Sequence, residues 1–133
     1  MIKALAHVCF TVKDLVVSER FYGGLLGMPV AFEFKSAERG RWGLYLRAGP
    51  RSFIELFTGE PGAVPAQGSY RHLCLEVDDL AREVARLRAA GLTVTDPKRG
   101  MDLSWQAWIT DPDGNRIELH EYTPESWQMP HVS

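Results

Sequence analysis

A pattern repeated after about 65 residues runs through this 133-residue chain and limits the folds that the chain can adopt. His7 and His72 are 65 positions apart, and Cys9 and Cys74 share that spacing. Each half starts with alternating apolar and polar residues, continues with an amphipathic stretch that ends at Gly, and finishes with another alternating stretch. The sequence therefore predicts two βαβββ modules related by duplication.

The same order of elements is expected in both halves. The first module, about 4–58, is predicted to hold, in order, a strand at 4–12, a helix at 15–26 and strands at 30–34, 42–46 and 53–57. The second module, about 70–122, repeats this order with a strand at 70–77, a helix at 80–90 and strands at 92–95, 104–110 and within 111–122. A Gly- and Pro-rich linker at 59–69 and a tail at 123–133 complete a single predicted domain.

Helix ends are marked by side chains with known capping behaviour. Asp14 is expected to cap the first helix and Asp78 or Asp79 the second, because an Asp side chain accepts hydrogen bonds from the free N–H groups of the first turn. Gly27 and Gly91 are expected to end the helices. Val16, Phe21, Leu25 and Leu26 are the predicted buried stripe of the first helix.

Composition excludes several classes of function. A hydrophobic content of 45% and a charged content of 24% are typical of a globular protein. A net charge of −2 gives no electrostatic reason to expect nucleic acid or an anionic membrane as partner. The chain shows neither a signal peptide nor a transmembrane run, and two cysteines make no disulfide framework, so we expect a cytoplasmic protein.

The repeat also duplicates a set of polar residues that a sheet core does not need. His7 and His72 begin the modules, and Glu55 and Glu118 lie on their last strands, on the face opposite the helix-packing residues. Two imidazoles and two carboxylates that converge need a positive charge between them. A divalent metal meets this need, and mixed nitrogen and oxygen donors suit Ni, Co, Zn, Mn or Fe.

These four residues, together with the run Asp111-Pro112-Asp113-Gly114-Asn115-Arg116-Ile117-Glu118-Leu119, resemble the vicinal oxygen chelate superfamily. This superfamily comprises glyoxalase I, bleomycin resistance proteins and extradiol dioxygenases. The resemblance covers residues 4–122 and implies an α+β fold. In that fold, a curved, incompletely closed eight-stranded mixed sheet surrounds one divalent metal per site, held by His7, Glu55, His72 and Glu118. It also implies a homodimer that binds a small-molecule substrate.

The ligand order His, Glu, His, Glu looks most like glyoxalase I. The implied function is that of a lyase, isomerase or epimerase that removes a proton next to a metal-bound carbonyl or hydroxyl, through an enediolate-like intermediate. Glu118 and Glu55 are the candidate catalytic bases, and the symmetry of the repeat leaves the choice between them open. Thr11 stands where bacterial glyoxalase I carries an Arg for the glutathione tail, which argues against methylglyoxal–glutathione as the substrate.

Two alternatives come from other branches of the same superfamily. An Fe(II)-dependent extradiol-type dioxygenase uses only His, His and Glu, so Glu55 would be surplus. A non-catalytic small-molecule or antibiotic binding protein generally lacks the metal ligands, whereas this chain has the complete set.

Five further residues are candidates for substrate binding on the ligand-bearing face: Tyr45, Arg47, Glu76, Trp108 and His120. Arg47 is either a partner for a substrate carboxylate or phosphate, or a solvated Arg at a hairpin end. Trp108 offers a surface for a ring or sugar, or an ordinary hydrophobic wall. Glu76 and His120 are acid/base groups or supports of the ligands, or residues of a hydrated sheet edge.

Overall fold

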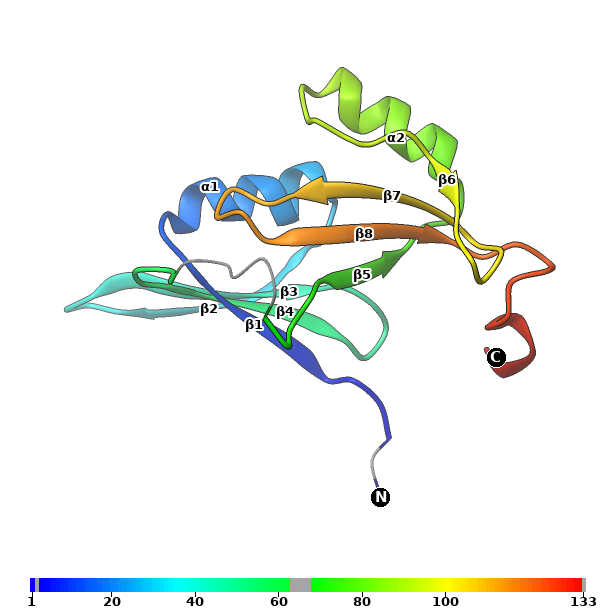
Figure 1. Ribbon diagram of the computed structural model, residues 1–133. Coiled ribbons are helices and arrows are strands. Elements are labelled where there is room, and N and C mark those ends of the chain that lie inside the picture. The colour runs from blue at the N-terminus through cyan, green and yellow to red at the C-terminus, as the bar shows by residue number, and fades with distance from the viewer. Residues whose placement is uncertain (2, 63–67, 133) are drawn as a thin grey trace. The chain divides into compact units, whose positions relative to one another are not determined.

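The protein folds into two compact units, Met1–Ala63 and Val64–Ser133, in the computed structural model (Figure 1). The structure describes residues 1, 3–62 and 68–132, so positions 63–67 of the predicted linker lie outside the described residues. Each unit holds one open four-stranded mixed sheet and at least one helix, which confirms the predicted α+β class. None of the helices in the described part of the chain is long and apolar enough to cross a membrane.

The first unit has the expected βαβββ order. Its elements are β1 (His7–Val12), α1 (Leu15–Glu19), the π-helical turn η1 (Arg20–Leu25), β2 (Val30–Ser36), β3 (Gly40–Arg47) and β4 (Phe53–Thr58). The strand order is β1-β4-β3-β2, with β1 parallel to β4 and the other pairs antiparallel. The first and last strands of the unit are therefore neighbours.

The second unit repeats this arrangement. Its elements are β5 (Leu73–Glu76), α2 (Leu80–Ala89), β6 (Lys98–Arg99), β7 (Trp105–Thr110), β8 (Arg116–Glu121) and the 3-10 turn η2 (Met129–His131). The strand order is β5-β8-β7-β6, and β5 runs parallel to β8. The strands in the described residues thus form two four-stranded sheets, one in each unit.

The first helix departs from the continuous helix predicted over 15–26. After α1 the chain continues as a π-helical turn, in which Leu26 N–H donates to the Phe21 carbonyl over 2.9 Å. A π turn holds more residues than an α turn. Phe21 and Tyr22 are buried in this turn, whereas Val16, another member of the predicted stripe, is 50% exposed because α1 turns Leu15 and Ser18 inward instead.

The predicted strand at 92–95 is absent, and the corresponding strand is β6 at Lys98–Arg99. Thr95 makes only a local contact with β7: its N–H donates to the Trp108 carbonyl, and its Oγ1 accepts from Trp108 N–H. Pro97 follows and has no N–H to donate, so a regular ladder with β7 begins only after it.

The second helix agrees closely with its prediction. The Asp79 side chain caps it by accepting from Arg82 N–H over 2.9 Å, and Gly91 follows its end with a φ of 90°. Leu80, Val84 and Leu87 are buried on the side facing the sheet. Helix α2 contacts β7 and β8, the strands that carry the polar residues of this unit.

The turn before β8 is held by a buried carboxylate. Asp111 Oδ1 accepts from the backbone N–H groups of Asp113 at 2.9 Å and Asn115 at 2.8 Å, and Oδ2 accepts from the Asn115 side chain. Gly114 has a φ of 89°, a conformation that glycine adopts without strain. The turn sets the point at which β8 begins, and hence the register that places Glu118 opposite Trp108.

We expect Asp111→Ala to lower the free energy of unfolding by about 1–3 kcal/mol, because it leaves the half-buried backbone N–H groups of Asp113 and Asn115 without their acceptor. Urea denaturation followed by circular dichroism measures the change. Asp78→Ala is the matched control: its side chain is 90% exposed, and we expect a change below about 0.5 kcal/mol. Equal losses in both variants would contradict the role of the turn.

Candidate functional site

In the first unit, the neighbouring strands β1 and β4 bring His7 and Glu55 onto one face. Glu55 on β4 pairs with Cys9 on β1 in the parallel ladder. His7 lies two residues before Cys9, on the same face of β1. The His7 Nε2 and Glu55 Oε1 atoms are 4.0 Å apart. An imidazole and a carboxylate that are nearly 50 positions apart in sequence thus meet because the first and last strands of the unit pair.

The second unit contains the equivalent pair at closer range. His72 precedes β5, Glu118 lies on β8, and the His72 Nε2 and Glu118 Oε2 atoms are 3.0 Å apart. The Glu118 residue is buried, at 8% exposure, whereas the imidazole of His72 is partly open to solvent. The predicted metal ligands are therefore brought together as one His–Glu pair in each unit.

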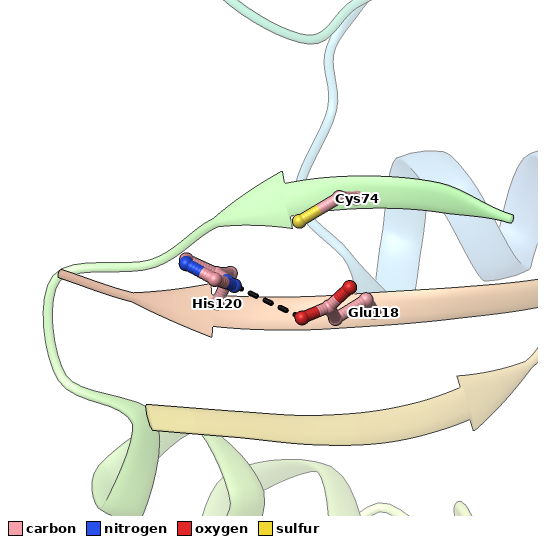
Figure 2. A group of neighbouring side chains, drawn as sticks. All are labelled: Cys74, Glu118 and His120. Atoms are coloured by element: carbon pink, nitrogen blue, oxygen red, sulfur yellow. Dashed lines mark hydrogen bonds and ion pairs between the residues drawn. The ribbon is translucent and has the colours of Figure 1, made fainter. Parts of the chain in front are cut away.

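His120 makes the second unit different from the first. Its Nδ1 lies 2.9 Å from Glu118 Oε1, so the two oxygens of Glu118 each contact an imidazole. His120 is buried, at 9% exposure, which rules out the alternative of a hydrated sheet edge. Figure 2 shows His120 beside Glu118 on β8, with Cys74 on the adjoining strand β5.

The other nitrogen of His120 faces a loop and the C-terminal segment. Nε2 lies 3.6 Å from Asp102 Oδ2 and has no hydrogen-bond partner among the described residues. Asp102 in turn accepts a hydrogen bond from the Gln128 side chain at 2.5 Å, which lowers the pKa of Asp102. The sequence carried no signal for this chain of contacts, because Asp102 lies in the loop between β6 and β7, Gln128 lies in the C-terminal tail, and neither belongs to the duplicated set of polar residues.

The two cysteines lie next to the two glutamates. Cys9 pairs with Glu55 and Cys74 with Glu118 in the two parallel ladders. Sγ of Cys74 and ligand atoms of Glu118 and His120 all lie within 4.8 Å of one another. Loss of surrounding water raises the pKa of Cys9 to about 11 and that of Cys74 to about 12, so both thiols are protonated at neutral pH.

Two of the candidate substrate contacts lie beside the His–Glu pairs. Tyr45 pairs with Glu55 across β3 and β4, and its ring centroid is 5.5 Å from that of His7. Trp108 pairs with Glu118, and its edge-on ring lies 4.8 Å from that of His72. These equivalent positions of the repeat thus hold aromatic rings next to both imidazoles.

The other two candidates lie further from the pairs. Arg47 is exposed, donates to the Pro50 carbonyl at 3.3 Å and places its guanidinium 5.3 Å from the Phe53 ring centroid. Glu76 is also exposed and pairs with His120 in the ladder between β5 and β8. Both residues lie at the margin of the polar face in their own unit.

Comparison with known proteins supplies the family. The family model of the Glyoxalase/Bleomycin resistance protein/Dioxygenase superfamily matches residues 4–119. The chain is 32% identical to lactoylglutathione lyase of Salmonella typhimurium, over 88% of this chain and 91% of that protein. It is 30% identical to glutathione transferase FosA of Serratia marcescens, over 90% of this chain and 82% of that protein.

Solved structures agree with the sequence relatives. TnmS3, an antibiotic binding protein from Streptomyces sp. CB03234, superimposes with a TM-score of 0.74 and 30% identity, over 92% of this chain and 98% of that one. Family match, relatives and fold all confirm the resemblance that the ligand pattern and the Asp-Pro-Asp-Gly-Asn turn indicated. The chain belongs to the glyoxalase/bleomycin resistance protein/dioxygenase superfamily, also called the vicinal oxygen chelate superfamily.

Proposed function

We propose that this protein is a divalent-metal-dependent enzyme of glyoxalase type, a lyase, isomerase or epimerase acting on a small oxygenated molecule. The observation that carries the proposal is the duplicated His–Glu pair, with a nitrogen and an oxygen 4.0 Å apart in one unit and 3.0 Å apart in the other. Similarity to lactoylglutathione lyase supports the reaction class. A homodimer is proposed on the family resemblance alone, and a cytoplasmic location on the sequence features given above.

The donor chemistry of the two pairs fits a divalent metal, which members of the superfamily typically bind. His7, Glu55, His72 and Glu118 are the proposed ligands, and imidazole with carboxylate suits Ni, Co, Zn, Mn or Fe. Cys74 and His120 also offer donor atoms next to Glu118. We assign His120 a supporting role, because Phe57 stands at its place in the first unit and the proposed ligands are present in both units.

The metal, when bound, supplies a positive charge that polarises a substrate carbonyl and favours loss of the neighbouring proton. A carboxylate of the site takes up that proton. Glu118 is held by two imidazoles, at 3.0 and 2.9 Å, whereas Glu55 has a single imidazole at 4.0 Å. This difference supports Glu55 as the base, because it is the carboxylate with more freedom to move, and Glu118 as an anchored ligand.

A second candidate is a non-catalytic binding protein, favoured by the structural similarity to the antibiotic binding protein TnmS3. The two functions differ in what the glutamates must do. A binding protein needs no base, so Glu55→Gln would leave its ligand affinity unchanged. In a glyoxalase-type enzyme, the same variant would still bind the substrate but would lose catalytic turnover.

We expect the purified protein to contain a divalent metal, which elemental analysis detects. We also expect His72→Ala and Glu118→Gln each to reduce metal affinity by more than about 100-fold, a larger loss than the substitution of a residue that only supports a ligand usually causes. Isothermal titration with Ni²⁺, Co²⁺ and Zn²⁺ measures this. Glu76→Gln, an exposed carboxylate on the same sheet, is the control and should bind metal normally.

Two outcomes would overturn the proposal. One is a wild-type protein that binds none of these metals. The other is full metal-dependent activity in both Glu55→Gln and Glu118→Gln. Consumption of oxygen by the Fe(II)-loaded protein with a catechol would instead indicate the dioxygenase alternative.

We further expect His120→Phe, which introduces the residue found at the equivalent place in the first unit, to lower metal affinity by about 10- to 100-fold. The variant loses the contact that orients Glu118 Oε1. His120→Asn, whose amide nitrogen takes the place of Nδ1, should recover part of the loss. His131→Phe makes the same change in the exposed C-terminal turn and should have no effect, and an equal loss there would argue against the role of His120.

A further inference from the structure

The first unit carries an unusual concentration of aromatic rings on the sheet face that holds Glu55. We name it the aromatic face, and its members are Phe32 and Phe34 on β2, Trp42 and Tyr45 on β3, and Phe53 and Phe57 on β4. Tyr45 lies between Phe32 and Glu55 in the strand register. The aromatic face is therefore continuous with the His7–Glu55 pair.

Two local features of the backbone bring the rings together. The register between β2 and β3 shifts after Phe34, so Trp42 is an extra residue on β3, and its ring joins those of Phe34 and Phe57 at 5.2 and 5.6 Å. Gly43 lies between Phe34 and Phe57, and a Cβ there would come within 2.7 Å of the Phe57 ring. The missing side chain allows these two rings to meet across the strand, at 5.1 Å.

The rings form stacked pairs and keep part of their surface in solvent. Phe32 and Tyr45 stack at 4.6 Å with an interplanar angle of 16°. Phe32 remains 49% exposed, whereas the opposite face of the same sheet buries Leu44, Leu46 and Leu56 completely. On that opposite face the sheet thus supplies leucine side chains to the hydrophobic core, and the rings of the aromatic face are not part of this packing.

Comparison of the two units shows that the fold does not require aromatic residues here. Positions equivalent to Phe53, Phe57 and Gly43 in the second unit are Arg116, His120 and Gln106. The same sheet position thus tolerates polar side chains. We attribute the divergence to ligand binding, because duplicated modules with the same architecture otherwise share the same packing needs.

Cations flank the aromatic face at two places. The Arg39 guanidinium lies 4.5 Å from the Trp42 ring centroid, and that of Arg47 lies 5.3 Å from that of Phe53. Neither guanidinium has a carboxylate partner among the described residues, so both keep their positive charge available. Arg47 is the cation at the Tyr45 end of the aromatic face, because the Phe53 ring that it contacts lies 5.1 Å from the Tyr45 ring.

We propose that the aromatic face binds the substrate, and that this substrate is a planar aromatic molecule bearing an acidic group. Its ring stacks on the exposed ring of Phe32, which itself stacks on Tyr45, and its acidic group pairs with Arg47. The inference rests on the proposed function, since Glu55 then lies beside the bound ring system as the base. The Arg47 guanidinium, which has no carboxylate partner among the described residues, favours an acidic small molecule as the occupant of this face.

The test is an NMR titration of the full-length protein, metal-free and metal-loaded, with 2-naphthoate. Cyclohexanecarboxylate serves as the non-aromatic control and 2-naphthalenemethanol as the uncharged one. We expect 2-naphthoate to bind more tightly than either control and to shift the amide signals of β2, β3 and β4. Phe32→Leu should weaken its binding by about 2- to 12-fold, the usual range for one aromatic contact.

Two further variants make the result specific. Trp105→Leu removes a comparably exposed aromatic ring from the second unit and should leave 2-naphthoate binding unchanged. Arg47→Gln should weaken 2-naphthoate but not 2-naphthalenemethanol. Both altered side chains are exposed, so these variants are expected to fold, which the amide spectrum itself checks.

Several results would overturn the inference: equal affinity for 2-naphthoate and cyclohexanecarboxylate, equal effects of Phe32→Leu and Trp105→Leu, or signal shifts confined to the second unit. Loss of a dimer in Phe32→Leu, seen by light scattering, would assign the face to a second copy instead. Failure of the proposed function looks different: the protein binds no metal, yet 2-naphthoate still binds. Metal loading without binding of 2-naphthoate overturns the aromatic inference alone.

Discussion

The parallel pairing of the first and last strands in each unit is the constraint on which the candidate site depends. In a βαβββ module the last strand returns beside the first, so a His at one end of the module reaches a Glu near the other. Side chains on one face of a sheet recur every second residue, and a shift of register by one residue would turn the Glu toward the core. The buried Asp111 turn secures this register for Glu118.

The two units share this framework but use its polar face differently. In the second unit, Glu118 lies between His72 and His120, and Asp102 with Gln128 extends the polar contacts toward the C-terminus. In the first unit, Phe57 replaces His120 and a group of aromatic rings adjoins Glu55. One unit thus holds its carboxylate through two imidazoles, and the other presents ring surfaces around a carboxylate with a single, more distant imidazole.

Much of the fold was predictable because local chemistry controls it. Asp79 and Gly91 cap and end α2 as predicted, and Tyr45 lies on the ligand-bearing face of β3 as predicted, beside Glu55. The predictions that failed depend on backbone geometry. The first helix changes to a π turn at Arg20 instead of continuing as an α-helix to Leu26, and Pro97 delayed β6 to Lys98.

The sequence by itself determined the duplication, the superfamily and one His–Glu pair in each half, because the spacing of these residues is a property of the chain. Only the tertiary structure decided what surrounds each pair. The burial of His120 against Glu118, its approach to Asp102, and the gathering of rings around Gly43 each depend on contacts between residues distant in sequence. Such contacts follow from strand register, a bulge and a missing side chain, and no local pattern records their outcome.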